Sequence, residues 1–217
     1  MKRGWAPRRR LSGFRLQAKY RRATELRIKA GDSFSIINNP IETLETFQNL
    51  TEAVVKSKRP VYFDVRDSRT VTIDALLYLL ALTNAFRSFG FDYAIRGNLP
   101  SDPEAKKIFL ESGIYRYFES NSAPLKSNSQ CVQVFAGFNA DPRIAKKLCQ
   151  FAMARLGVGK VATRGLYDIV MEIILNTVQH AYDKRPDHQK WFAYARYEAE
   201  SESIRFTILD SGLGGAE

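Results

Sequence analysis

The sequence EIILNTVQHAY at residues 172–182 decides how the C-terminal half of this chain is expected to fold. Glu172, Asn176 and His180 recur every four residues, so a helix places them on one face over two turns. Apolar residues recur beside this row at Leu166, Ile169, Val170, Ile173, Ile174 and Val178. The pattern predicts an amphipathic helix over residues 163–182, whose polar row is either a solvated face or the wall of a cleft.

A second stretch, DSGLG at residues 210–214, contains two glycines that leave the backbone open to a ligand. Asp210 ends a predicted strand, and Gly212 and Gly214 follow it. Two strands joined by a tight polar turn are predicted at residues 191–198 and 204–209. Upstream, a strand is predicted at residues 132–138, and a helix capped by Asp141 at residues 142–156.

Taken together, the two stretches resemble the N box and the D-x-G-x-G motif, or G1 box, of the GHKL ATPases. This group contains gyrase, heat-shock chaperones, mismatch-repair proteins, histidine kinases and anti-sigma kinases. The resemblance covers residues 141–217 and implies the N-terminal part of a Bergerat-type ATP-binding α/β sandwich. A complete GHKL domain continues into a lid and a second glycine motif. We therefore expect a partial domain, as a fragment of a longer protein or as a fold that a partner completes, with the fragment favoured.

The resemblance implies ATP and Mg²⁺ as cofactors and gives each matching residue a role. Asn176 would offer its amide oxygen to Mg²⁺, and Glu172 would polarise the attacking water. Asp210 would accept a hydrogen bond from the adenine amino group, and the glycines after it would admit the base and sugar. His180 would border the nucleotide, with a packed or capping residue as the alternative. Hydrolysis of ATP and transfer of its phosphoryl group to a protein serine both stay open for the complete domain.

Strands and helices alternate over residues 31–118, which predicts an α/β layer with at least partly parallel strands. Strands are expected at residues 34–37, 61–65 and 93–96, and helices at 41–58, 72–89 and from Ser101 onward. The spacing of Ser101 and Glu104 fits a capping box. The pattern from residue 61 to 118 is similar to STAS domains, although Ala75 follows Asp74 where phosphorylatable members carry Ser or Thr. This resemblance implies a module that docks a protein partner.

Positive charge is concentrated at the N-terminal end of the chain. Residues 1–30 hold 11 of the 33 Lys and Arg and one acid, whereas the rest of the chain is balanced. This distribution excludes a uniformly basic nucleic-acid-coating protein. Guanidinium groups alternate with aromatic rings in this arm, which suits nucleic acid, with a solvated tail or an acidic protein partner as alternatives. The candidate contact residues are Arg8, Arg9, Arg10, Arg15, Arg21 and Arg22.

Other classes of protein are disfavoured by what the sequence lacks. The two cysteines form no C-x-x-C pair and only two histidines occur, so neither a zinc site nor a disulfide scaffold is expected. The longest apolar run, at residues 71–82, is too short for a bilayer and contains an aspartate. We therefore expect no membrane partner, and a cytoplasmic location as the default.

The sequence thus predicts an α/β protein in four parts: a basic arm (1–30), a STAS-like domain (31–118), a polar linker (119–130) and a partial GHKL-type ATPase domain (131–217). The function expected from this combination is an ATP-binding regulatory protein. The alternative is a non-catalytic adaptor that binds protein or nucleic acid through the arm and the STAS-like domain. A homodimer is compatible with either function, and a bacterial regulatory or phage-defence setting fits by analogy of domain combination.

Overall fold

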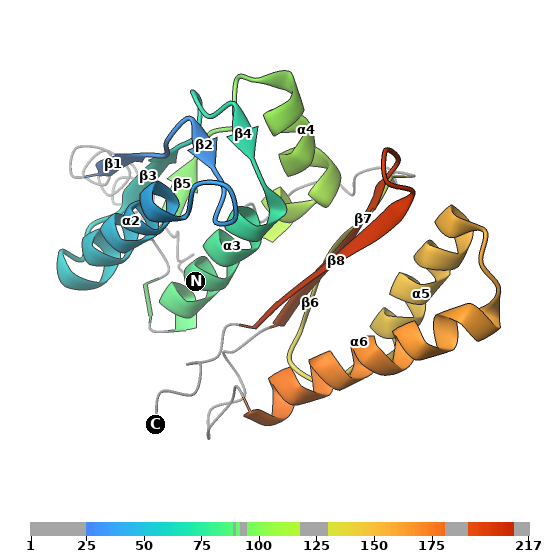
Figure 1. Ribbon diagram of the computed structural model, residues 1–217. Coiled ribbons are helices and arrows are strands. Elements are labelled where there is room, and N and C mark those ends of the chain that lie inside the picture. Colours follow the sequence, from blue (N-terminus) through green and yellow to red (C-terminus); the bar gives the residue numbers. More distant parts are fainter. Residues whose placement is uncertain (1–24, 89, 92–94, 118–129, 181–190, 211–217) are drawn as a thin grey trace, which may run out of the picture.

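The computed structural model describes residues 25–88, 90–91, 95–117, 130–180 and 191–210, and they form a mixed α/β fold. We call residues 25–117 the N-terminal module and residues 130–210 the C-terminal module. An antiparallel sheet in the C-terminal module lies between two sets of helices, one from each module (Figure 1). The expected α/β class is therefore confirmed.

The N-terminal module has a parallel three-stranded sheet in the order β1-β3-β5 and a parallel two-stranded sheet of β2 and β4. Its strands are β1 (Leu26–Lys29), β2 (Ser33–Phe34), β3 (Val61–Asp64), β4 (Thr70–Val71) and β5 (Ile95–Gly97). Its helices are α2 (Pro40–Thr51), the π-helical η1 (Glu52–Lys56), α3 (Ile73–Ser88), α4 (Pro103–Ser112) and the 3-10 helix η2 (Ile114–Tyr117). Parallel pairing agrees with the prediction from alternating strands and helices.

Strand β1 corrects the predicted boundary of the basic arm at residue 30. Its residues Leu26–Lys29 pair in parallel with β3, and Ile28 is buried in the core. Two cations assigned to the arm are also internal partners: Arg27 pairs with Asp64, and Lys29 pairs with Asp67. This strand was not predicted because it lies in a strongly basic stretch and only one of its side chains, that of Ile28, is buried. The six candidate arginines of the arm lie outside the described residues.

Asp64 ends the central strand β3 and is mostly buried, with 10% of its side chain exposed. Its Oδ2 lies 2.6 Å from Nη2 of Arg27, and its Oδ1 accepts hydrogen bonds from the Arg66 N–H and the Asn98 amide. Burial of Asp64 opposes ionisation. The hydrogen bonds from Asn98 and Arg66 and the charge of Arg27 outweigh that effect, so the pKa of the Asp64 carboxyl is lowered.

This lowered pKa makes the stability of the N-terminal module sensitive to acid. The stabilisation from Asp64 is fully present above about pH 4, the ordinary pKa of an unfolded aspartate, and is lost as pH falls through the lower folded value. The difference in unfolding free energy between wild type and Asp64→Asn should therefore shrink as pH is lowered from about 6 to about 3. Urea unfolding at each pH measures it, with the exposed Asp67 as a control in Asp67→Asn. A difference that stays constant with pH would contradict the assignment.

Two aspartates organise the helix starts of this module. Asp102, and not Ser101, caps α4, because its Oδ1 accepts the N–H groups of Glu104 and Ala105 at 3.0 and 2.9 Å. The predicted capping box is therefore wrong by one residue, since Asp102 has the same capping chemistry and directly precedes Pro103. Asp74, in the first turn of α3, accepts the N–H groups of residues 36 and 37 at 2.7 and 3.2 Å. It ties the loop after β2 to α3.

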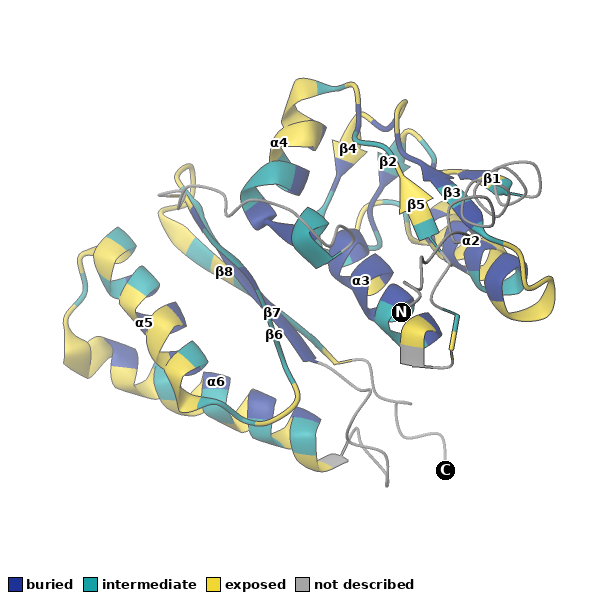
Figure 2. Cartoon of the chain, turned by 180° about the vertical axis from the view of Figure 1, so that it is seen from behind, coloured by how far each residue is buried: buried dark blue, intermediate teal, exposed yellow. Residues whose placement is uncertain are grey.

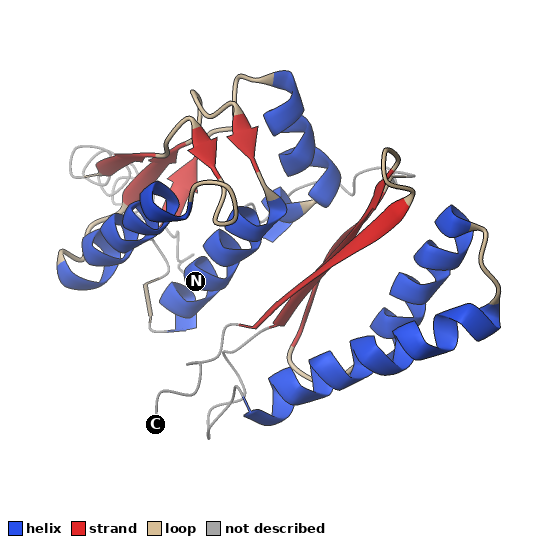
Figure 3. Ribbon diagram, in the orientation of Figure 1, coloured by secondary structure: helices blue, strands red, loops and turns tan. Residues whose placement is uncertain are grey.

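The C-terminal module follows the predicted order of strand, helix, helix, strand, strand. Its elements are β6 (Cys131–Gly137), α5 (Pro142–Leu156), α6 (Lys160–His180), β7 (Trp191–Glu198) and β8 (Ser203–Asp210). The three strands form an antiparallel sheet in the order β6-β7-β8 (Figure 3). Asp141 caps α5 by accepting the Arg143 N–H at 2.9 Å, as predicted, and Gly157 ends that helix with φ +65°.

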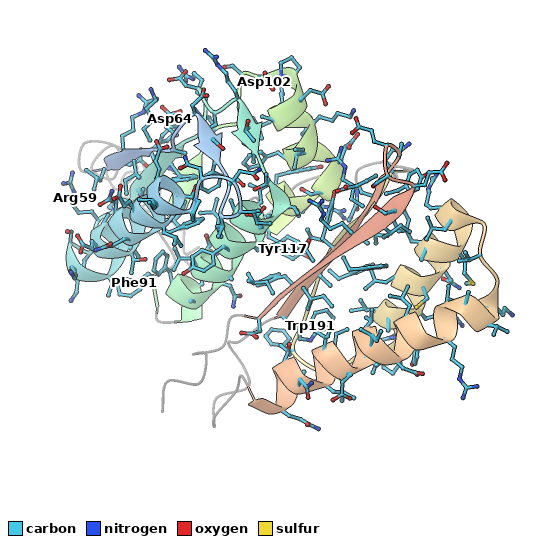
Figure 4. All side chains as sticks on the ribbon, viewed as in Figure 1. Arg59, Asp64, Phe91, Asp102, Tyr117 and Trp191 are labelled. Carbon is cyan, nitrogen blue, oxygen red and sulfur yellow. The ribbon has the colours of Figure 1, made fainter. Side chains whose placement is uncertain are left out.

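Both faces of the β6–β8 sheet are covered by helices, and residues 191–195 of the central strand β7 are buried. Along β7, Trp191, Ala193 and Ala195 belong to the core under α5 and α6, whereas Phe192 and Tyr194 belong to the core of the N-terminal module. Tyr117 of η2 fastens the second interface: its hydroxyl donates to the Val134 carbonyl at 2.9 Å, and its ring meets Phe192 edge-on. The two modules therefore share a continuous hydrophobic core, although a polar linker is predicted between them (Figure 4).

Candidate functional site

Helix α6 carries the predicted catalytic and metal-binding side chains on a face that is open to solvent. Glu172 and Asn176 are both exposed and lie one turn apart. Ile169 and Ile173 share that face, with 60% and 42% of their surface exposed. On the opposite side, Val170 and Ile174 are buried against the sheet and hold the helix in this rotation (Figure 2). The packing of α6 thus directs Glu172 and Asn176 outward together.

The exposure of Ile169 and Ile173 corrects the predicted apolar stripe. Six apolar positions were expected to form the buried side of this helix, but only Val170 and Ile174 are fully buried. Leu166 and Val178 pack at the edges of the core. Because successive residues are about 100° apart on a helix, a stripe containing both Ile169 and Val170 is wider than one sheet contact covers. The open face of α6 therefore presents two exposed isoleucines together with two polar side chains.

Strand β8 ends at Asp210, which is exposed and stands opposite Trp191 in the register of the hairpin. The hairpin end that carries Asp210 and the C-terminal end of α6 lie at the same end of the module (Figure 1). Trp191 is completely buried between this end of the sheet and α6, and its Nε1 donates to the Asn139 carbonyl at 3.2 Å. Asp210 is therefore held in position through its pairing with the buried Trp191.

Several predicted site residues cannot be placed on this framework. His180 is the last residue of α6, and its side chain lies outside the described part of the structure. Gly212 and Gly214 also fall outside the described residues. The roles of these three residues, and those of Glu172 and Asn176, stay predictions.

The chemistry of the placed side chains fits a magnesium nucleotide. Glu172 and Asn176 offer a carboxylate and an amide oxygen, the kind of ligand that Mg²⁺ prefers. No group of three or more His, Cys, Asp or Glu side chains that could hold a metal ion occurs among the residues that the structure describes. Mg²⁺ commonly binds through one or two protein oxygens, with waters and substrate phosphates filling the other positions. The exposed amide oxygen of Asn176 is consistent with that mode of binding.

The N-terminal module contains a cavity that the sequence did not indicate. It has a volume of about 380 Å³ and lies at the carboxyl ends of β3 and β5, where ligands commonly bind in parallel sheets. Its apolar lining includes Phe63, Leu79, Ile95, Leu99 and Phe109, and its polar groups include Arg96 and Asn98. Both polar groups are already engaged, Arg96 with Glu25 and Asn98 with Asp64. Only the small residues and turn after β5 could have indicated a cavity here.

Comparison with known proteins gave no match: no protein-family profile, curated protein or solved structure is significantly similar to this chain. Within the described residues, every helix is too short or too polar to cross a bilayer.

Proposed function

We propose that this chain is an ATP-binding regulatory protein of the GHKL type, with a STAS-like N-terminal module. The observation that carries the proposal is the pairing of Glu172 and Asn176 on the open face of α6, beside a strand that ends in Asp210. The antiparallel hairpin packed on α6 is consistent with the nucleotide-binding half of that fold.

Each side chain has a distinct part in the proposed mechanism. Bound Mg-ATP supplies the electrophilic phosphoryl group. The Asn176 amide oxygen would hold the metal, and the Glu172 carboxylate, one turn away, would accept a proton from the attacking water or hydroxyl. Asp210 would accept a hydrogen bond from the adenine amino group, which guanine lacks at that position. Ile169 and Ile173 would be covered when the face is occupied, which removes exposed apolar surface from water.

The shared core supports a regulatory role for the N-terminal module. Helices α3 and α4 pack on the face of the β6–β8 sheet opposite to α6, so one sheet contacts both the nucleotide side and the proposed docking module. A partner that displaces the N-terminal module would alter the packing behind β7 and β8. We propose that a protein partner acts through this route, and that the basic arm contributes contacts with the partner or with nucleic acid.

Calorimetric titration with Mg-ATP and the variant Asn176→Ala test this proposal. Loss of the amide oxygen should weaken Mg-ATP binding by about 10- to 100-fold, the usual cost of disturbing a metal site. The effect should vanish in EDTA, because the amide acts through the metal. Gln179→Ala, an exposed amide on the same helix, is the matched control and should bind like the wild type. Equal affinities of Asn176→Ala and Gln179→Ala would contradict the proposed metal role and favour the adaptor alternative.

A further inference from the structure

A second cavity, of about 180 Å³, lies between the two modules. From the C-terminal module it is lined by side chains on the inner face of the β7–β8 hairpin, among them Arg196, Glu198 and Arg205. From the N-terminal module it is lined by the loop after β2 and by Thr72 and Asp74 at the start of α3. The cavity is smaller than typical sites for drug-sized ligands, which begin at about 300 Å³. Any resident ligand is therefore small.

Two arginines line this cavity, Arg196 partly buried and Arg205 largely exposed. Arg196 of β7 and Arg205 of β8 are directly paired in the hairpin register, on the same sheet face as Tyr194 and Thr207. Like charges in directly opposite positions destabilise a sheet. Glu198 compensates one of them, because its Oε1 lies 3.2 Å from Nε of Arg205. Arg196 makes no ion pair with any residue that the structure describes.

Neither Arg196 nor its polar neighbour across the cavity has a partner of its own. Among the described residues, no hydrogen bond or ion pair involves the Arg196 guanidinium. The Thr72 hydroxyl oxygen is buried and has no hydrogen-bond partner in the structure. The Asp74 carboxylate also lines the cavity and keeps its negative charge, and its Oδ2 accepts the N–H groups of residues 36 and 37. Buried hydroxyl groups are almost always paired, so this cavity lacks an acceptor for both groups.

We propose that this cavity binds a small oxyanion, of the size and charge of phosphate, at the junction of the two modules. The anion accepts hydrogen bonds from the Arg196 guanidinium and the Thr72 hydroxyl, and its charge pairs with that of Arg196. Asp74 lies in the first turn of α3 and opposes the anion, so the contacts with Arg196 and Thr72 carry the binding. Because Thr72 and Arg196 belong to different modules, the bound anion joins the N-terminal module to the sheet.

Titration of the full chain with inorganic phosphate, at constant ionic strength set with sodium chloride, tests this proposal by calorimetry. We expect saturable binding that Arg196→Gln weakens by about tenfold or more and that Thr72→Val weakens by about threefold to tenfold. Glycerol 3-phosphate, titrated in parallel, distinguishes a free oxyanion from a phosphomonoester. Asn176→Ala should bind phosphate like the wild type, which separates this site from the proposed nucleotide site.

Controls keep a general charge effect and a folding defect apart from loss of the site. Arg164→Ala removes an exposed arginine on α6 and should leave phosphate binding unchanged. Without phosphate, Arg196→Gln should keep or raise the thermal midpoint because it removes the like-charge pair, whereas a structural arginine would lower it. The proposal is overturned by the absence of saturable phosphate binding, by equal losses in Arg164→Ala and Arg196→Gln, or by unchanged binding in both Arg196→Gln and Thr72→Val.

Discussion

Replacing Trp191 with alanine is expected to lower the free energy of unfolding by about 3 to 5 kcal/mol, the usual cost of deleting a fully buried large aromatic side chain. Trp191 has no exposed surface and fills the core between the sheet and helices α5 and α6. Its ring also lies against Gly137, where an added Cβ would approach a ring carbon to 2.6 Å. The substitution would in addition leave the Asn139 carbonyl without its donor at 3.2 Å.

Urea unfolding followed by far-ultraviolet circular dichroism measures this loss. Ile173→Ala is the control from the same module, because Ile173 is 42% exposed and its truncation should cost less than about 1 kcal/mol. Similar losses for Trp191→Ala and Ile173→Ala would show that the core under α6 is packed differently from the arrangement described above. The result would then remove the structural base for Asp210 as well.

Glu172→Gln is expected to lower ATP turnover by about 100-fold or more, because the amide cannot accept the proton of the attacking nucleophile. The affinity for Mg-ATP should change by less than about threefold, since the proposed role of Glu172 lies in the transition state and not in ground-state binding. Single-turnover reactions with ATP labelled at the γ-phosphate measure the loss. Counting both released and protein-bound label distinguishes hydrolysis from phosphoryl transfer to a serine.

Asp168→Asn is the matched control for this experiment. Asp168 is an exposed acid on α6, one turn before Glu172, and has no assigned role in the mechanism. We expect Asp168→Asn to turn over ATP at the wild-type rate. Full activity in Glu172→Gln, or equal losses in both variants, would remove the catalytic assignment. A wild-type chain that binds Mg-ATP without releasing or transferring phosphate would support a nucleotide-binding function without catalysis by this chain.

The elements of the C-terminal module were largely predictable because their signals are local. Asp141 before Pro142 is a strong helix start, and two segments rich in apolar and β-branched or aromatic residues, separated by a polar turn, predict β7 and β8. The start of α6 was less accessible: the helix begins at Lys160, three residues before the predicted Thr163. Gly157 ends α5, and only two residues separate that glycine from α6. Such a short connection leaves no polar segment to reveal the boundary.

Contacts between the modules were not predictable from periodicity alone. Periodicity indicates which side of an element is apolar but does not identify the surface that covers it. One signal was present in β7: Trp191, Phe192, Ala193, Tyr194 and Ala195 are apolar on both strand faces. A strand with two apolar faces is typical of a sheet covered on both sides. The side chains of β7 that follow this apolar run, Arg196 and Glu198 among them, lie at the edge of the interface between the modules.

The candidate site was predictable to a similar, partial extent. Helical spacing correctly indicates that Glu172 and Asn176 share a face, since the geometry of a helix determines it. Whether that face is buried depends on where the sheet packs, so the exposure of Ile169 could not be deduced. The cation Arg196 and the hydroxyl of Thr72 were missed because they are 124 positions apart in the sequence and meet only through module packing.

Titration of the wild-type chain with Mg-ATP and, separately, with Mg-GTP tests the central claim most directly. The proposed site predicts saturable binding of one ATP per chain and much weaker binding of GTP, because Asp210 accepts a hydrogen bond from the adenine amino group. A loss of ATP affinity of about 10- to 100-fold in Asn176→Ala, seen only in the presence of Mg²⁺, would connect the affinity to the open face of α6. No saturable ATP binding, or equal affinity for ATP and GTP, would contradict the account.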